Sequence, residues 1–329
     1  MRESIPCWQK NLAEGFSSAA ELLSFLNLPT SLADNLAEKQ FKTRVPRSFA
    51  SRMQPANPTD PLLLQVLAVE EELETTDGFS SDPLAEDAAN HLPGLIHKYH
   101  GRVLLTVAGA CAVNCRYCFR RHFPYQKNNP GRAGWQPVLD YIANDPEIHE
   151  VILSGGDPLL ATDTILEPLL KQLAAIPHLH TLRFHTRIPV VLPERINEQF
   201  IKLLADNRLH KVIVLHSNHP QELDANVLLV CKTLRDVGCH LLNQSVLLAG
   251  VNDNAYVLAE LSERLFTLGV LPYYLHLLDK VQGAAHFDTP VDQALEIFQK
   301  LQSLLPGYLV PRLVREEPGK KSKTLLGYS

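Results

Sequence analysis

The chain has 329 residues, of which 45% are apolar and 20% are charged, with a formal net charge of −5. This composition is typical of a globular protein with a full hydrophobic core and excludes a disordered chain. No run of Lys and Arg is long enough to follow a phosphate backbone, so we do not expect nucleic-acid binding.

The first 95 residues predict an N-terminal helical extension. Helical periodicity covers Ser18–Leu26 and Pro61–Glu74, and polar segments with Pro and Asp separate and follow these stretches. None of the chemical motifs described below falls in this part of the chain. We therefore expect residues 1–95 to form an extension and residues 96–329 to form the catalytic unit.

From about Arg102 onward, short apolar or β-branched runs alternate with helical patterns. The predicted strands are Val103–Val107, Val151–Leu153, Leu182–His185, Val212–Leu215, Leu241–Val246 and Tyr273–Leu277. The predicted helices are Trp135–Ala143, Ile165–Ala175, Glu194–Ala205, Glu222–Val237, Ala255–Leu268 and Val291–Leu304. This alternation predicts βαβ crossovers and an α/β fold with one parallel sheet, closed or partly closed. The active site of such a sheet lies at the carboxyl ends of its strands.

Three cysteines follow the first of these strands in the spacing C-x3-C-x2-C: Cys111, Cys115 and Cys118. Thiolates are the ligands of iron–sulfur clusters, and three of them can hold three irons of a [4Fe–4S] cluster while one iron stays open. A zinc site is the first alternative, but a closed structural zinc site needs a fourth ligand, and only His122 is near. Three inert buried cysteines in one loop are the second alternative.

The number of cysteines and the length of the apolar runs indicate in which cellular compartment the protein is expected. Six cysteines are too few for a disulfide scaffold in a chain of 329 residues. The N-terminus has no apolar segment of the secretory type, and no apolar run reaches the roughly 18 residues that a membrane span needs. We expect a cytoplasmic protein with no membrane contact.

The cysteine spacing, with an aromatic residue before the last cysteine, resembles the radical S-adenosylmethionine superfamily. The resemblance implies a partial (β/α)6 TIM-like barrel in which the open iron binds S-adenosylmethionine. The end of the second predicted strand, Ser154-Gly155-Gly156-Asp157, is similar to the glycine-rich segment that binds the methionine amino group in that superfamily. Glycines allow such a close backbone approach to a ligand.

Later motifs resemble the lysine 2,3-aminomutases more closely. They are Ile176-Pro177-His178, the run 186–196 (TRIPVVLPERI), the run 216–220 (HSNHP), and residues 243–253 (NQSVLLAGVND). The likeness extends from about Ile96 to Thr324. The run 118–125 (CFRRHFPY) and the short C-terminus resemble the bacterial branch that makes β-lysine for modification of elongation factor P.

This resemblance implies a second cofactor, pyridoxal 5′-phosphate, on a lysine near the C-terminus. Counting from Pro311 and matching Ser-Lys-Thr selects Lys323, while Lys320 and Lys321 remain alternatives, as does a plain solvated tail. A lysine that forms a Schiff base needs a pocket that favours its neutral form. Positions around the pyridoxal ring and phosphate are matched by Tyr99, Arg102 and Arg187, and a further cofactor-binding position is matched by Gln244. The arginines could equally form structural ion pairs.

The substrate contacts are also carried over by resemblance. Arg120 matches the arginine that holds the substrate α-carboxylate, and a planar guanidinium suits a carboxylate. Asp279 and Glu316 match the two acids that hold the ε-ammonium of lysine, although the family usually has Asp where this chain has Glu316. Lys323 would be the catalytic lysine, and the reaction would move the amino group of L-lysine from C2 to C3 by radical chemistry.

The cofactor motifs are also compatible with two other functions. An aminomutase for glutamate or arginine would keep every cofactor motif and differ at Asp279 and Glu316, and a structural zinc-binding protein is the remaining alternative. The expected partners are L-lysine, an external electron donor and, through the product, a ligase that acts on elongation factor P. A homo-oligomer is compatible with the sequence.

Overall fold

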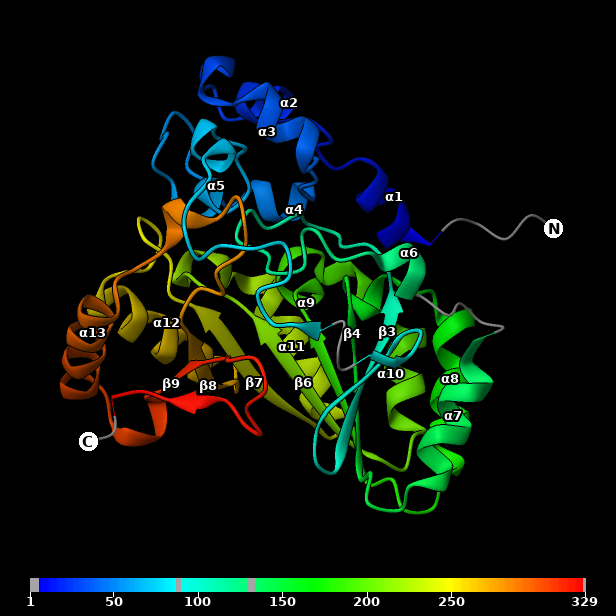
Figure 1. The fold of residues 1–329 in the computed structure, drawn as a ribbon. Coiled ribbons are helices and arrows are strands. Elements are labelled where there is room, and N and C mark those ends of the chain that lie inside the picture. The colour runs from blue at the N-terminus through cyan, green and yellow to red at the C-terminus, as the bar shows by residue number, and fades with distance from the viewer. Residues whose placement is uncertain (1–5, 87–89, 129–133, 328–329) are drawn as a thin grey trace.

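A ten-stranded sheet forms the centre of the molecule, and its strands follow one another in chain order (Figure 1). The computed structural model describes residues 6–86, 90–128 and 134–327. The strands from β3 to β9 pair in parallel, whereas β1, β2 and β10 join at the edges in antiparallel fashion. The strands are β1 Asn90–Leu92, β2 Leu95–Tyr99, β3 Arg102–Ala108, β4 Glu150–Gly155, β5 Thr181–Thr186, β6 His210–His216, β7 Cys239–Val246, β8 Leu271–His276, β9 Arg312–Arg315 and β10 Thr324–Leu325.

The six predicted strands are confirmed as β3 to β8, and the four edge strands were missed. β1 and β2 form a hairpin whose turn uses Gly94 at φ +83°, a conformation that suits glycine. β9 and β10 have only four and two residues, too few for a period-two pattern to stand out. These short strands place the first and last residues of the barrel domain at the two edges of the sheet.

The sheet curves into a partial barrel. Lys98 and Tyr99 at the end of β2 both contact Glu316, which follows β9 near the opposite edge of the sheet. These contacts bridge more than two hundred residues of sequence, and they require the two edges to approach one another. The predicted partial TIM-like barrel is confirmed, with side chains rather than strand pairing joining the edges among the described residues.

Helices cover the outer face of the barrel (Figure 1). They are α7 Trp135–Asn144, α8 Asp163–Ala175, α10 Glu198–Ala205, α11 Ala225–Asp236, α12 Ala255–Thr267 and α13 Val291–Leu304. Two four-residue helices, α6 Tyr125–Asn128 and α9 Ile188–Val191, lie instead at the carboxyl ends of the strands. The predictions for α10 and α11 began several residues too early. The side chains of Asn197 and Asp224 cap these helices and therefore set their first turns.

The N-terminal extension contains short helices: α1 Cys7–Ala13, α2 Ala19–Phe25, α3 Asn35–Gln40, α4 Arg47–Ala50 and α5 Pro61–Leu64. The predicted helix at Ser18–Leu26 is confirmed as α2, whereas the single helix predicted for Pro61–Glu74 is wrong. The carbonyls of Gln65 and Ala68 accept hydrogen bonds from Arg116 N and Asp34 N. Because other segments use these carbonyls, they cannot serve a continuous helix.

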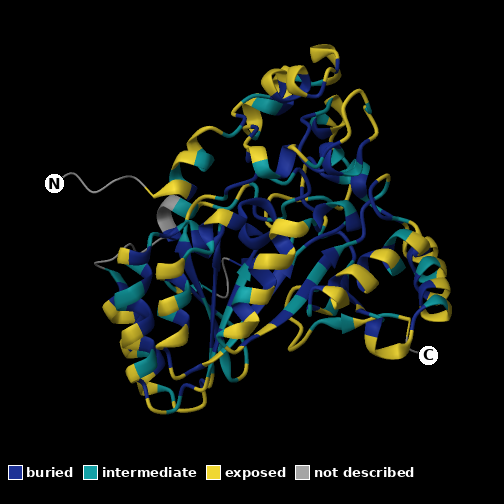
Figure 2. Ribbon diagram, turned by 180° about the vertical axis from the view of Figure 1, so that it is seen from behind, coloured by how far each residue is buried: buried dark blue, intermediate teal, exposed yellow. Residues whose placement is uncertain are grey.

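Buried residues lie along the sheet and beneath the helices, and exposed residues line the outer helix faces (Figure 2). One hydrophobic cluster includes residues of the extension, such as Trp8 and Phe49, together with barrel residues such as Leu153 and Phe184. The extension therefore packs into the same core as the barrel. No helix within the described residues is long and apolar enough to cross a membrane.

Candidate active site

The cysteine loop follows β3 and is held from behind by the N-terminal extension. Arg44 Nη1 donates to Cys111 O at 3.0 Å, and Asn114 N donates to Arg44 O at 3.0 Å. Asn114 Nδ2 also donates to Lys42 O at 2.7 Å. Backbone bonds of this kind fix the loop path, so the extension shapes the position of all three cysteines.

A buried group of three charges ties the same loop to the extension. Arg116 donates to Glu72 through Nε at 2.8 Å and Nη2 at 2.6 Å, and Arg121 Nη2 donates to Glu72 Oε2 at 2.7 Å. Bidentate pairs of this geometry are strong and directional, and removing one partner would leave an uncompensated buried charge. Glu72 therefore anchors the loop on both sides of Cys118.

The three thiols lie close enough to influence one another. Burial raises the pKa of Cys111, and the neighbouring Cys118, Asp157 and Cys115 raise it further. Burial and Cys115 raise the pKa of Cys118 to about 11. A positive charge at this place would lower both pKa values, because it stabilises the thiolate. The thiolate is also the form of cysteine that binds metal.

This donor set fits a [4Fe–4S] cluster better than a single ion. Within the described residues, no three His, Cys, Asp or Glu side chains converge on a point that could hold one metal ion. A closed zinc site needs such convergence of four ligands. The thiolates of a cubane cluster each bind a different iron, so three neighbouring sulfurs around a shared space suffice.

The glycine-rich end of β4 packs directly on the residues before Cys111. Gly156 N donates to Ala108 O at 2.8 Å, and a Cβ at Gly156 would lie 2.3 Å from Ala110 O. Gly155 adopts φ +113°, and a Cβ there would lie 2.6 Å from Ala108 O. Only glycine allows this approach, so these two residues fix the distance between the β4 end and the cysteine loop.

Asp157 links the ends of β4 and β5. Its carboxylate accepts hydrogen bonds from Leu159 N, Thr186 Oγ1, Arg187 N and Ile188 N, at 2.7 to 3.2 Å. Burial raises its pKa, whereas these hydrogen bonds oppose the rise. The contacts are all internal, which indicates that Asp157 supports the predicted cofactor segment from behind.

Arg187 lies on the cluster side of the lumen. Its Nη1 donates to Cys115 Sγ at 2.7 Å, and its Nη2 donates to Gln65 and Glu222 at 2.6 and 3.0 Å. The described contacts join it to the cysteine loop and not to Lys323. A cation beside a sulfur stabilises the thiolate, which suits a cluster ligand.

Arg120 is buried two residues after Cys118. Its Nε and Nη2 donate to the two carboxylate oxygens of Glu86, both at 2.7 Å, and its Nη1 lies 3.3 Å from Ser154 Oγ. The guanidinium also lies over the rings of Phe119 and Phe123. The predicted substrate arginine thus reaches the glycine-rich end of β4.

Lys323 and Glu316 meet inside the barrel. Lys323 Nζ pairs with Glu316 Oε2 and lies 5.8 Å from the ring centre of Tyr274 on β8. Glu316 Oε1 also accepts hydrogen bonds from Lys98 Nζ and Tyr99 OH, each at 3.0 Å. Burial opposes ionisation of Glu316, but Lys323 and Lys98 outweigh it and lower its pKa to about 2.

The environment of Lys323 distinguishes it from its neighbours in sequence. Lys320 and Lys321 are exposed, whereas Lys323 is partly buried beside Glu316. Arg102 lies 4.8 Å from the ring of Tyr99, so the two predicted ring and phosphate contacts are adjacent. An amine, a phenol and cations around one space fit pyridoxal phosphate, with Lys323 as the attachment point.

Asp279 follows β8 and faces the same space. Burial and the negative charge of Glu316 raise its pKa to about 7, while Lys323 opposes the rise. Glu86 also raises this pKa, and Lys98 lowers it. The charges of Glu316 and Lys323 thus both act on Asp279.

Lumen residues that the sequence analysis missed include Lys98, His185 and His276. Burial, Arg183, Lys323 and Arg120 lower the pKa of His185 well below its usual value, and its Nε2 is buried without a hydrogen bond. Burial and Lys323 lower the pKa of His276 to about 3. Both imidazoles are thus neutral at physiological pH.

A sequence signal exists for His185. The β5 run TLRFHT alternates polar and apolar residues, and its burial follows the same period, which places His185 on the lumen face. Lys98 and Tyr99 are consecutive, yet both reach Glu316 because the pairing of β2 shifts its register between Ile96 and Tyr99. Gln244 pairs in register with His216 and Tyr274, which puts it on the same face as these two.

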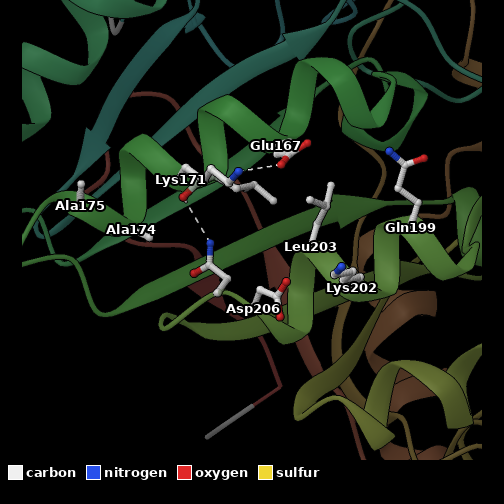
Figure 3. A pocket seen from close by; sticks show the side chains of 10 residues that line it. Glu167, Lys171, Ala174, Ala175, Gln199, Lys202, Leu203 and Asp206 are labelled. Carbon is white, nitrogen blue, oxygen red and sulfur yellow. Dashed lines mark hydrogen bonds and ion pairs between the residues drawn. The ribbon is translucent and has the colours of Figure 1, made fainter.

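A separate cavity of about 690 Å³ lies on the outer helical layer, between α8 and α10 (Figure 3). Its charged lining includes Glu167, Lys171, Lys202 and Asp206, and Lys171 bonds to Glu167 across one turn. None of its lining residues belongs to the cysteine loop or the barrel lumen. The chemistry-bearing residues are thus in the lumen and not in this outer groove.

Comparisons with known proteins agree with this geometry. Residues 100–187 match the family model described as 4Fe-4S single cluster domain. The chain is 52% identical to the L-lysine 2,3-aminomutase of Escherichia coli (strain K12) over 322 residues, covering 97% of this chain and 94% of that protein. It is also 52% identical to the L-lysine 2,3-aminomutase of Haemophilus influenzae, covering 97% and 95%.

More distant similarities were also found. The L-lysine 2,3-aminomutase of Clostridium subterminale is 36% identical, with 96% of this chain and 77% of that protein covered. A solved radical SAM methyltransferase from Sphaerobacter thermophilus aligns at 19% identity and a TM-score of 0.45, covering 67% of this chain and 68% of that chain. That structure is too distant to add to the functional assignment.

Proposed function

The chain belongs to the L-lysine 2,3-aminomutase family, and on this basis we propose that it converts L-α-lysine to β-lysine. The observation that supports the proposal is the ion pair of Glu316 with Lys323, together with the buried Asp279, whose pKa both of these charges affect. Two acids at this place favour a substrate with a distal ammonium group. As a member of this family the protein is an enzyme, an isomerase that moves an amino group within its substrate.

The cofactors divide the chemistry. Cys111, Cys115 and Cys118 would hold the [4Fe–4S] cluster, which would bind S-adenosylmethionine, and Lys323 would hold pyridoxal phosphate. When bound, these groups supply a radical and a conjugated system on which the amino group migrates from C2 to C3. The segment Ser154–Asp157 borders the space for S-adenosylmethionine, and Tyr99, Arg102 and Gln244 border the space around Lys323.

The protein supplies orientation and exclusion of water. Arg120 would bind the substrate carboxylate at one end, and Asp279 with Glu316 would bind the ε-ammonium at the other. The charges of Lys323 and Arg120 both lower the pKa of His185, after burial and Arg183. An amino acid held at both ends keeps C2 and C3 at a fixed place relative to Lys323.

Glu316 has a second task before substrate arrives. Its carboxylate is shared by Lys98, Tyr99 and Lys323. If Lys323 held the cofactor, Glu316 Oε2 would be available to accept a hydrogen bond from the substrate ammonium. Lys98 and Tyr99 keep the carboxylate in place meanwhile, because they bind the other oxygen, Oε1.

We further propose that the β-lysine serves modification of elongation factor P. The run 118–125 (CFRRHFPY), which resembles the bacterial branch with that role, supports this proposal. A cytoplasmic location follows from a target in translation. The reaction also needs an external one-electron donor for the cluster, and a homo-oligomer is compatible with it. To test this, the reaction product is incubated with purified elongation factor P and its ligase. Mass spectrometry of elongation factor P should then show the addition of one β-lysyl group.

Substrate choice is tested with a panel of amino acids. The protein is reconstituted anaerobically with iron, sulfide, pyridoxal phosphate, S-adenosylmethionine and a reductant, and is then given L-lysine, L-arginine or L-glutamate. We expect β-lysine from lysine and little product from glutamate, because two acids would repel a distal carboxylate. Turnover of glutamate in preference to lysine would overturn the assignment of Asp279 and Glu316.

A further inference from the structure

Glu86 reaches the lumen from outside the barrel. It lies before β1, in the segment that leads from the N-terminal extension to the sheet. Its carboxylate receives both side-on donors of Arg120, Nε and Nη2, at 2.7 Å each. Glu86 and Arg120 are only 6% and 7% exposed, so water does not compete for this pair.

The pair uses one edge of the guanidinium and leaves the other. A guanidinium can bind carboxylates along two edges, Nε with Nη2 and Nη1 with Nη2. Glu86 occupies the first edge. On the second edge, Nη1 has only long contacts, to Ser154 Oγ at 3.3 Å and Gly155 O at 3.5 Å. That edge points to the glycine-rich end of β4.

Two aromatic rings restrict the remaining freedom of the guanidinium. Arg120 Cζ lies 4.9 Å from the ring centre of Phe119 and 5.7 Å from that of Phe123. Rings at these distances attract the cation but do not select a rotation within its plane. The carboxylate of Glu86 provides that selection, because a bidentate pair fixes the orientation of both planes.

We propose that Glu86 is a positioning residue: it holds Arg120 by one edge so that the other edge meets the carboxylate of the amino-acid substrate. This inference rests on the proposed function, in which Arg120 binds that carboxylate. It gives the N-terminal extension a direct part in substrate recognition. The opposite role, a carboxylate that competes with substrate for Arg120, would require Glu86 to leave. The second edge, where Nη1 makes only the long contacts to Ser154 and Gly155, would instead let both carboxylates bind at once.

The test measures how much the substrate carboxylate contributes to binding. L-Lysinamide, which lacks that carboxylate, is used as an inhibitor of lysine turnover by the reconstituted enzyme. The ratio of the lysinamide inhibition constant to the KM for lysine reports the carboxylate contribution. Wild type, Glu86→Ala, Glu86→Gln and Glu86→Asp are compared. If wild type does not turn over lysine, the proposed function fails and not this inference alone.

The chain offers a matched control in another buried pair. Arg195 donates to Asp163 at 2.8 Å and lies 5.0 Å from the ring centres of both Trp8 and Phe200, away from the lumen. Asp163→Asn therefore removes the same kind of charge from the same kind of environment. It can lower the amount of folded enzyme, but it should leave the ratio unchanged.

For Glu86→Ala we expect the KM for lysine to rise about ten- to a hundredfold, because this is the contribution of charge-assisted hydrogen bonds to binding. The inhibition constant of lysinamide should hardly change, because lysinamide has no carboxylate for Arg120 to bind. Glu86→Asp should recover part of the loss, since charge is retained. If Glu86→Ala does not fold, Glu86→Gln decides by the same ratio. A fall in the KM for lysine would identify Glu86 as a competitor, and an unchanged ratio would make it structural; either result overturns the inference.

Discussion

Replacing Asp279 with Asn tests whether the buried acid pair binds the substrate ammonium. In the ligand-free protein, burial and Glu316 raise the Asp279 pKa from 3.8 to about 7. A rise of this size corresponds to about 4 kcal/mol of ionisation cost. A substrate ammonium would offset that cost on binding. Losing one partner of a buried charge pair costs about 3–5 kcal/mol, so kcat/KM for lysine should fall roughly 10²- to 10⁴-fold at pH 8.

The pH dependence has a definite sign. Below about pH 7 the carboxyl of Asp279 is neutral in the free enzyme and cannot attract the ammonium. The kcat/KM for lysine should therefore rise with pH, about tenfold per unit, and level off above pH 7. The free energy of unfolding depends on pH in the opposite direction. Asp279 keeps its proton to higher pH in the folded state than in the unfolded state, so its contribution to stability is full below about pH 4 and is lost as pH rises through 7.

The assay is β-lysine formation at several pH values by the reconstituted wild type and Asp279→Asn. A matched control is Asp288→Asn, because burial also raises the pKa of Asp288 but its charged neighbours are Lys280 and Arg315. We expect the control to stay within about twofold of wild type. Unchanged lysine turnover in Asp279→Asn, or a pH limb that persists in it, would refute the reasoning.

Other substitutions test the cofactor sites. Changing any one of the three loop cysteines to Ala should abolish the brown chromophore and turnover, while Cys231→Ala in α11 should keep both; wild-type iron content in a loop variant would contradict the cluster assignment. Borohydride reduction and peptide mapping should find the pyridoxyl group on Lys323. A pyridoxyl group on Lys320 instead would contradict the assignment of Lys323 as the cofactor lysine. Gly156→Ala should displace the cysteine loop and reduce cluster content, because its Cβ would lie 2.3 Å from a backbone oxygen, whereas Gly307→Ala has open space around it; equal cluster content in both would count against the packing argument.

Local periodicity predicts the parallel strands of the barrel, but it does not predict contacts that depend on the path of distant segments. The alternation of strands and helices predicted β3 to β8, and the spacing of three cysteines indicated the loop chemistry. The helix predicted for Pro61–Glu74 is wrong because remote backbone donors use its carbonyls. Periodicity carries no information about such donors.

The same distinction holds within the candidate site. Lys323 and Glu316 were selected by resemblance, and the structure places them in contact. Lys98 was missed because a register shift, invisible in the sequence, turns it to the same side as Tyr99. Glu86 was missed because it belongs to a polar segment with several acids, and only the fold shows that its carboxylate is the one that meets Arg120.

The central claim is tested most directly by following the amino group of lysine. The reconstituted enzyme is incubated anaerobically with L-lysine that carries ¹⁵N at C2, and the product is examined by NMR. The account predicts β-lysine with the label on C3, formed only when S-adenosylmethionine, reductant and pyridoxal phosphate are all present. Unchanged lysine under full reconstitution, or label-bearing product formed without pyridoxal phosphate, would contradict it.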